Sequence, residues 1–208
     1  AVENDFDFLA ASFVRTADDI RAIKAELNRH GCKDMRIIAK IENREGIENA
    51  DAILAESDGL MVARGDMGVE IPFEEIPIIQ KQLIRKVYLA GKQVVTATQM
   101  LDSMMKNPRP TRAETTDVAN AIAQRADAIM LSGETASGKY PVEAVETMSR
   151  IAIETEESIT TPPDLDLENV TKPIAGVLAR SLVAATLKLP VKAIIFDTWS
   201  GRTGRYLA

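Results

Sequence analysis

Residues 36–43 read Arg-Ile-Ile-Ala-Lys-Ile-Glu-Asn, and residues 59–66 read Gly-Leu-Met-Val-Ala-Arg-Gly-Asp. Each stretch is a nearly continuous apolar run that ends in charged residues. Such runs are typical of parallel strands covered on both faces, because a half-exposed strand alternates apolar and polar residues. The two stretches therefore predict buried parallel strands with polar side chains at their carboxyl ends.

The same pattern extends in both directions along the chain. Further apolar runs occupy residues 8–14, 93–98 and 128–131, and amphipathic stretches that predict helices lie at 17–29, 47–54, 74–90, 112–125 and from 141 onward. Residues 57–61 and 126–130 resemble each other, since each pattern predicts a helix end, a turn with aspartate and the start of a buried strand. Strands that start about every 25 to 35 residues have the spacing of βα units. Five such units predict an α/β fold, either part of a (β/α)8 barrel or a doubly wound parallel sheet.

The composition is that of a globular protein. Of the 208 residues, 46% are hydrophobic and 27% are charged, which excludes the disordered, collagen-like and disulfide-rich classes. The net charge of −6 argues against a nucleic-acid partner. The single cysteine, Cys32, fits a reducing cytoplasm, and the single histidine, His30, excludes a two-histidine metal site. No apolar run reaches the roughly 20 residues of a membrane helix, so no membrane partner is expected.

The character of the sequence changes after residue 159. Residues 160–164 read Thr-Thr-Pro-Pro-Asp, and we place a linker at 160–172. We expect a helix at 173–189, a strand at 192–198 and a loop at Gly201 and Gly204. The predicted organisation is a first domain at 1–159 and the start of a second α/β domain at 173–208.

Polar residues follow four of the five predicted strands. In parallel α/β folds the functional site forms at the carboxyl ends of the strands. The candidate site residues at these ends are Lys40, Glu42, Gly65, Asp66, Thr98 and Ser132.

The residue types at these ends suit a metal ion and an anion. Glu42 and Asp66 are carboxylates that suit Mg²⁺ or Mn²⁺, with coordination positions left for water and substrate oxygens. Lys40 shares a strand face with Glu42, and a lysine beside a divalent cation suits a phosphate or an enolate. Gly65 lets backbone N–H groups approach such an anion closely.

Structural roles compete with these assignments. A lysine–glutamate pair at a strand end is often a surface ion pair, and Asp66 can cap the turn that follows it. Thr98 and Ser132, which supply hydroxyl groups to the candidate site, can instead be helix N-caps. Compatible chemistry at four strand ends favours a metal-assisted site that handles an anion.

Two motifs are rejected. Residues 133–140 nearly match a P-loop, but Tyr140 stands where the magnesium-binding hydroxyl belongs. Residues 64–66 spell an adhesion tripeptide, but the end of a buried strand is the wrong place to present it. Cys32 precedes a strand, away from the strand ends, so a nucleophile role is not expected.

Five segments carry a resemblance to a known family. They are residues 40–43 (Lys-Ile-Glu-Asn), 61–68 (Met-Val-Ala-Arg-Gly-Asp-Met-Gly), 97–101 (Ala-Thr-Gln-Met-Leu), 107–114 (Asn-Pro-Arg-Pro-Thr-Arg-Ala-Glu) and 130–135 (Met-Leu-Ser-Gly-Glu-Thr). Together, and in this order, they resemble the pyruvate kinases, and their residues look like those of the bacterial members. The resemblance implies that residues 1–159 are strands four to eight of a (β/α)8 TIM barrel. Residues from 173 then begin the C-terminal α/β domain of that family.

The resemblance also implies a reaction, the last step of glycolysis. The phosphoryl group of phosphoenolpyruvate passes to ADP, which gives pyruvate and ATP. Glu42 and Asp66 match the ligands of the divalent metal, and Lys40 matches the lysine that stabilises the phosphoryl group and the enolate.

Other residues match the contacts of the substrate. The backbones of Gly65 and Asp66 match contacts to the substrate carboxylate, and Thr98 matches a hydroxyl contact. Ser132 matches a residue near the path of the proton to the enolate carbon. The resemblance further implies a K⁺ ion whose ligands lie outside this chain, and a homotetrameric parent protein.

The resemblance also identifies what this chain lacks. The first three barrel strands and the lid domain of the family have no counterpart in it. We therefore expect a partial sequence that has little or no activity as an isolated polypeptide, with open sheet edges that favour aggregation.

Two alternatives stay open at this point. Metal-dependent aldolases and other enolate-handling barrels also place glutamate and aspartate at successive strand ends, and carbon–carbon cleavage would distinguish them. The chain can also be an interaction piece without activity, for which an absence of metal binding would argue.

Overall fold

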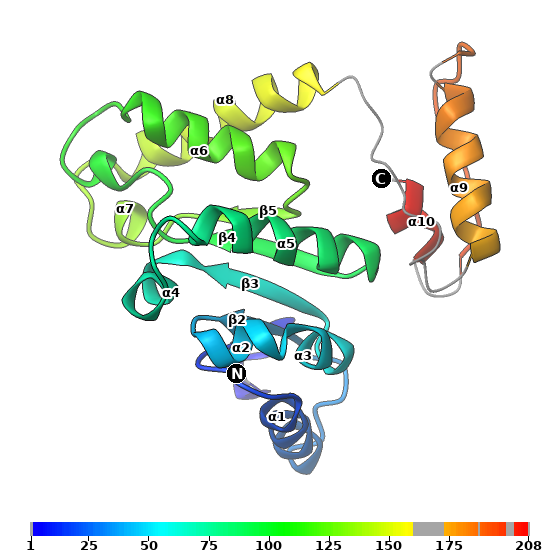
Figure 1. The fold of residues 1–208 in the computed structure, drawn as a ribbon, viewed down its shortest axis with the longest axis horizontal. Helices are drawn as coiled ribbons and strands as arrows, with labels where there is room; N and C mark the ends of the chain where they lie inside the picture. The colour runs from blue at the N-terminus through cyan, green and yellow to red at the C-terminus, as the bar shows by residue number, and fades with distance from the viewer. Residues whose placement is uncertain (1, 160–172, 187, 199–201, 208) are drawn as a thin grey trace.

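The computed structural model describes residues 2–159, 173–186, 188–198 and 202–207. The strands are β1 (Phe8–Ala11), β2 (Arg36–Ile41), β3 (Gly59–Ala63), β4 (Gln93–Ala97) and β5 (Ala128–Met130). Between them lie η1 (Val2–Asn4), α1 (Ala17–Arg29), α2 (Arg44–Glu48), α3 (Ala50–Glu56), α4 (Arg64–Glu70), α5 (Ile76–Leu89), η2 (Asp102–Met105), α6 (Arg112–Ala123), α7 (Gly133–Ala136) and α8 (Pro141–Ser158). Figure 1 shows this alternation of strands and helices.

The order of the strands decides between the two predicted α/β folds. The sheet of the described residues runs β1-β2-β3-β4-β5, and every neighbouring pair is parallel. In a doubly wound sheet the order in which strands are added reverses at a switch point. In a barrel each new strand is added on the same side of the previous one. The fold is therefore part of a (β/α)8 barrel.

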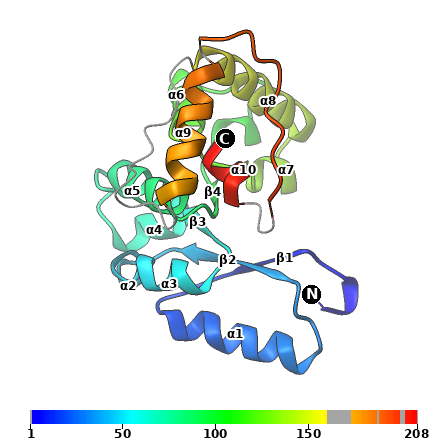
Figure 2. The ribbon, with the colours of Figure 1, turned by 90° about the vertical axis from the view of Figure 1, so that its right-hand side faces the viewer.

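Helices α1, α3 and α5 cover one face of the sheet. Their buried residues Ile20, Ile53 and Leu83 belong to one apolar cluster with Ile37 and Leu60 of the strands. Figure 2 shows α1 lying beside β1 and β2. Burial of this face accounts for every second residue of the continuous apolar runs.

The opposite face carries its own small cluster. Ile38, Met61 and Ala97 are buried together with neighbouring strand residues. Residues two apart share a strand face, so Lys40 lies on the same face as Ile38. In a barrel this is the inner face.

The two similar segments, residues 57–61 and 126–130, make the same kind of contact. Asp58 precedes β3, and its carboxylate accepts the N–H of Ile37 (2.8 Å) at the start of β2. Asp127 precedes β5, and its carboxylate accepts the N–H of Val94 (2.7 Å) near the start of β4. Each aspartate therefore helps to set the register between its strand and the neighbouring one.

Some helix predictions need correction. The expected helix around 47–54 is two helices, α2 and α3, which meet at Asn49. The side chain of Asn49 donates to the carbonyl of Arg15 (2.9 Å), which ties the junction to the loop after β1. Helix α4 was not expected, because its residues were read only as a strand end. Helix α1 begins after Thr16 and ends at His30, as predicted.

The C-terminal segment differs more. Helix α9 (Pro173–Thr186) confirms most of the helix expected at 173–189, but Ile174 on its predicted apolar face is 79% exposed. The strand expected at 192–198 is wrong, since residues 191–198 have no regular secondary structure and pair with no strand among the described residues. A strand without a partner leaves its backbone groups unpaired. Gly204 lies in α10 (Arg202–Leu207) rather than in a loop, and Gly201 and the linker at 160–172 lie outside the described residues.

The described ranges contain no helix with the length and apolar character needed to cross a membrane.

Candidate active site

The sheet register brings the predicted site residues to one edge. Lys40 pairs with Met61, Ala63 pairs with Ala97, and Ala97 pairs with Met130. The residues that directly follow these positions therefore leave the sheet side by side at its carboxyl edge. This edge carries all six candidate residues.

Lys40, which is partly buried, forms an ion pair with the buried Glu42. Lys40 Nζ lies 2.5 Å from Glu42 Oε1, and the two side chains are only 21% and 2% exposed. Lys40 Nζ also donates to Ser12 Oγ (3.2 Å) in the loop after β1. The pair is therefore more enclosed than an ordinary surface ion pair.

The loop after β1 belongs to the site although the sequence reasoning assigned it no role. Glu42 Oε2 accepts the N–H of Phe13 (2.6 Å), and Phe13 has a left-handed backbone with φ +57°. A bulky residue rarely adopts this conformation. The apolar run at 8–14 predicts a strand throughout, whereas β1 ends at Ala11 and the chain turns at Ser12 and Phe13.

Thr98 and Gly65 are in direct contact. The N–H of Gly65 donates to Thr98 Oγ1 (2.7 Å), and the same hydroxyl donates to the carbonyl of Ala97 (2.7 Å). Thr98 and Gln99 are both left-handed, with φ +68° and +54°. Such a conformation costs on the order of 1–3 kcal/mol per residue and tends to occur at functional sites. Thr98 is not the N-cap of any helix in the part of the chain that the structure describes.

Arg64 is a site-edge residue that the sequence reasoning missed. It is 8% exposed, and its Nη1 lies 2.6 Å from Asp117 Oδ2. Its Nη2 donates to the carbonyl oxygens of Thr98 (2.7 Å) and Gln99 (3.2 Å). Its burial agrees with the rejection of the adhesion motif. The available signal was a lone arginine directly after a fully apolar run.

Ser132 is held by a second residue that the sequence reasoning left without a role. Glu134 is 2% exposed, and its two carboxylate oxygens accept the N–H groups of Ser132 (2.9 Å) and Leu101 (3.0 Å). Glu134 therefore ties the end of β5 to the loop after β4. Ser132 occupies the N-cap position of α7, but its side chain makes no capping hydrogen bond there.

Asp66 stands apart from the others. It is exposed within the first turn of α4, and the described contacts include no hydrogen bond or ion pair of its side chain. No group of three or more acidic, histidine or cysteine side chains suited to a metal occurs among the described residues. Glu42 Oε1 is buried and faces Lys40 Nζ at 2.5 Å without a hydrogen bond of good geometry, so a cation would have to share this oxygen with the lysine. Two carboxylates fit a cation such as Mg²⁺, which usually keeps several waters.

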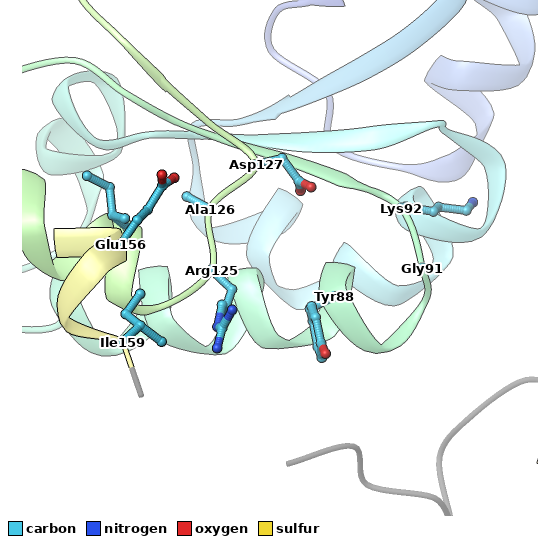
Figure 3. A pocket seen from close by; sticks show the side chains of 9 residues that line it. Tyr88, Gly91, Lys92, Arg125, Ala126, Asp127, Glu156 and Ile159 are labelled. Carbon is cyan, nitrogen blue, oxygen red and sulfur yellow. The ribbon is translucent and has the colours of Figure 1, made fainter. Parts of the chain in front are cut away.

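One cavity lies away from these residues. A pocket of about 330 Å³ is lined by Tyr88, Arg125, Asp127 and Glu156, and Figure 3 shows these side chains around it. Asp127 precedes β5, which places the pocket at the amino edge of the sheet, away from the candidate residues. Burial raises the pKa of Tyr88, whose hydroxyl has no hydrogen-bond partner among the described groups.

Comparison with known proteins decides the family. The family model for the pyruvate kinase barrel domain matches residues 1–145. The chain belongs to the pyruvate kinase family. A pyruvate kinase of Bacillus licheniformis is 54% identical over the whole of this chain, and one of Geobacillus stearothermophilus is 53% identical. Pyruvate kinase 1 of Saccharomyces cerevisiae is 50% identical over the same extent.

The pyruvate kinase match covers every candidate site residue. It confirms the resemblance carried by the five segments and sets aside the aldolase alternative. The chain spans 36% of the length of the two bacterial relatives and 42% of the yeast relative.

Proposed function

We propose that this chain supplies part of the active site of an enzyme that transfers the phosphoryl group of phosphoenolpyruvate to ADP. The observation that carries the proposal is the Lys40–Glu42 pair at the carboxyl edge of a pyruvate kinase barrel sheet. The chain by itself is expected to be inactive, because the five strands of the described residues do not close a barrel.

Lys40 is proposed to stabilise the negative charge that develops during the reaction. The P–O bond of phosphoenolpyruvate breaks while a new P–O bond to ADP forms, and charge spreads over the phosphoryl oxygens and the enolate oxygen. Lys40 is held in place by Glu42 and Ser12, so its ammonium group needs little reorganisation to meet this charge.

Glu42 and Asp66 are proposed to hold a divalent cation, Mg²⁺ or Mn²⁺. When bound, such a cation neutralises negative charge on substrate oxygens. Glu42 is already fixed by the N–H of Phe13, whereas Asp66 is exposed and free to turn toward a substrate.

The backbones of Gly65 and Asp66 and the hydroxyl of Thr98 are proposed to bind the substrate carboxylate. To bind the carboxylate, the Thr98 hydroxyl turns its proton away from the Ala97 carbonyl. The Gly65 N–H, which here donates to the Thr98 oxygen, reaches the same anion only by giving up that contact. Ser132 is proposed to lie near the path along which the enolate carbon takes up a proton. Glu134 fixes the backbone of Ser132, which leaves its hydroxyl available.

The remaining proposals concern the parent protein. Family membership supports a K⁺ requirement, with its ligands outside this chain, and a homotetramer in the cytoplasm. No nucleic-acid or membrane partner is proposed.

The test replaces Lys40 in a complete enzyme. Residues 1–208 are exchanged into the Bacillus licheniformis relative, and this protein is called the complete enzyme below. Lys40→Met is expected to lower kcat for phosphoryl transfer by about 10²-fold or more, with little change in Mn²⁺ affinity. Lys81→Met, at an exposed position of α5, is the matched control and is expected to leave kcat unchanged. An unchanged kcat in Lys40→Met would remove Lys40 from its role.

A further inference from the structure

Arg64 is a buried cation at the site edge that the proposed chemistry does not use. Its exposed fraction is 8%, and it is the first residue of α4, directly after β3. A buried charge is costly unless it is paired and hydrogen-bonded, so its contacts indicate what it contributes.

The guanidinium group contacts the turn after β4 and two helices at once. Nη2 donates to the Thr98 and Gln99 carbonyls at 2.7 and 3.2 Å, and Nε lies 3.3 Å from the Thr98 carbonyl. Nη1 lies 2.6 Å from Asp117 Oδ2 on α6 and 3.4 Å from Gln80 Oε1 on α5. Arg64 therefore joins the turn after β4 to the helices that surround it.

The contacted turn has an unfavourable backbone. Thr98 and Gln99 are consecutive left-handed residues, and Thr98 is β-branched. This conformation persists only where the surroundings hold it. It also sets the position of the Thr98 hydroxyl, which accepts the N–H of Gly65.

We propose that Arg64 is a positioning residue, whose guanidinium holds the Thr98–Gln99 turn and thereby places the Thr98 hydroxyl for the substrate. The inference rests on the proposed function of Thr98. Arginine is needed because its planar head donates to two carbonyls and one carboxylate together, which a lysine ammonium on a flexible stem does not reproduce.

The test is a double-mutant cycle in the complete enzyme, with Arg64→Lys and Thr98→Val. Valine keeps the backbone carbonyl of position 98 and removes only the hydroxyl. If Arg64 acts through that hydroxyl, Arg64→Lys lowers kcat about tenfold or more when Thr98 is present, and less than about twofold in the Thr98→Val protein. Arg150→Lys, on the exposed side of α8, is the control for loss of a guanidinium.

Each outcome has a distinct meaning. Equal losses of kcat in both backgrounds would show a merely structural role and overturn the inference while leaving the proposed function intact. A Thr98→Val protein with full activity would remove Thr98 from the proposed function and the inference with it. If thermal unfolding shows that Arg64→Lys does not fold, Asp117→Asn takes its place in the cycle. Asp117→Asn is then expected to lower kcat when Thr98 is present, by a smaller factor than Arg64→Lys, and to have little effect in the Thr98→Val protein. An equal loss of kcat in the Thr98→Val protein again overturns the inference.

Discussion

Buried charges at the site edge bind backbone groups of the loops after the strands. Glu42 accepts the N–H of Phe13, Arg64 donates to the carbonyl of Thr98, and Glu134 accepts the N–H of Ser132. Because hydrogen bonds to a charged group are stronger than neutral ones, each can hold a loop in a conformation that it would not adopt alone. At the scale of single residues, the site is therefore a set of loop backbones held in place by buried charged side chains.

Gly65→Ala tests how closely the Thr98 hydroxyl is placed. A Cβ at position 65 lies 3.2 Å from Thr98 Oγ1 and 3.5 Å from Thr98 Cβ, so the threonine has to shift by a few tenths of an ångström. We expect kcat of the complete enzyme to fall about tenfold, since small displacements in an active site are costly.

Gly68→Ala is the matched control for this change. A Cβ at position 68 lies no closer than 3.5 Å to its nearest neighbour, Ile76 Cδ1, and the residue lies in the same helix. If the two alanine variants show the same steady-state kcat, the position of the Thr98 hydroxyl does not matter for the reaction.

At the scale of elements, Glu114 joins η2 to the start of α6. Its carboxylate accepts the N–H of Ser103 (2.7 Å) and the N–H of Thr111 (2.7 Å), and it also contacts both hydroxyl groups. Thr111 and Glu114 form the capping box of α6. This segment follows β4 directly, so the capping box also supports the loop that carries Thr98.

The pKa of Glu114 predicts a pH dependence of stability. Partial burial by itself raises this pKa, but the hydrogen bonds from Ser103 and Thr111 outweigh burial, and the net pKa lies below the ordinary value of 4.5. A carboxylate with a lowered folded pKa stabilises the protein above its unfolded pKa, and this stability is lost as the pH falls through the folded value. We therefore expect the Tm advantage of wild type over Glu114→Gln to shrink as the pH falls below 4.5.

Thermal unfolding of the 208-residue chain between neutral and acid pH measures this difference. Glu157→Gln, at an exposed position of α8, serves as the control variant. A difference between wild type and Glu114→Gln that stays constant down to acid pH would contradict the prediction.

At the scale of the whole molecule, the sheet has two open edges. Strands β1 and β5 each have one neighbour in the described residues, so each leaves backbone groups unpaired on its other side. Edge strands of this kind favour self-association. The site residues nevertheless lie on β2 or directly after it, at the starts of α4 and α7, and in the loop after β4. The proposed metal ligands Glu42 and Asp66 therefore depend mainly on the interior of the sheet.

We therefore expect the chain to bind Mn²⁺ without the rest of a barrel. Water proton relaxation during a Mn²⁺ titration measures the binding, and the Glu42→Gln/Asp66→Asn double variant is expected to lose it. Binding by wild type alone would show that the strand ends are assembled in this chain. Equal weak binding by both proteins would mean that the metal site forms only in the complete enzyme.

Local patterns were enough for most of the elements and for the positions of the candidate site. Apolar runs predicted all five strands, helical periodicity predicted α1, α5, α6 and α8, and the strand ends pointed to Lys40, Glu42 and Thr98. These features depend on neighbours in sequence, because strand and helix periodicity and turn residues act over a few positions. The prediction of a strand at 192–198 was wrong because a strand needs a pairing partner, and the local sequence does not reveal whether one is present.

The sequence by itself determined that the chain is an α/β protein of the pyruvate kinase family with polar residues at four strand ends. Only the tertiary structure decided that the strands add in sequential order, that Glu42 of the Lys40–Glu42 pair is buried, and that Thr98 is left-handed. It alone revealed the role of Arg64, whose partners Thr98 and Asp117 lie 34 and 53 residues away. Contacts over such separations arise from packing of the whole sheet against its helices, which no local pattern encodes.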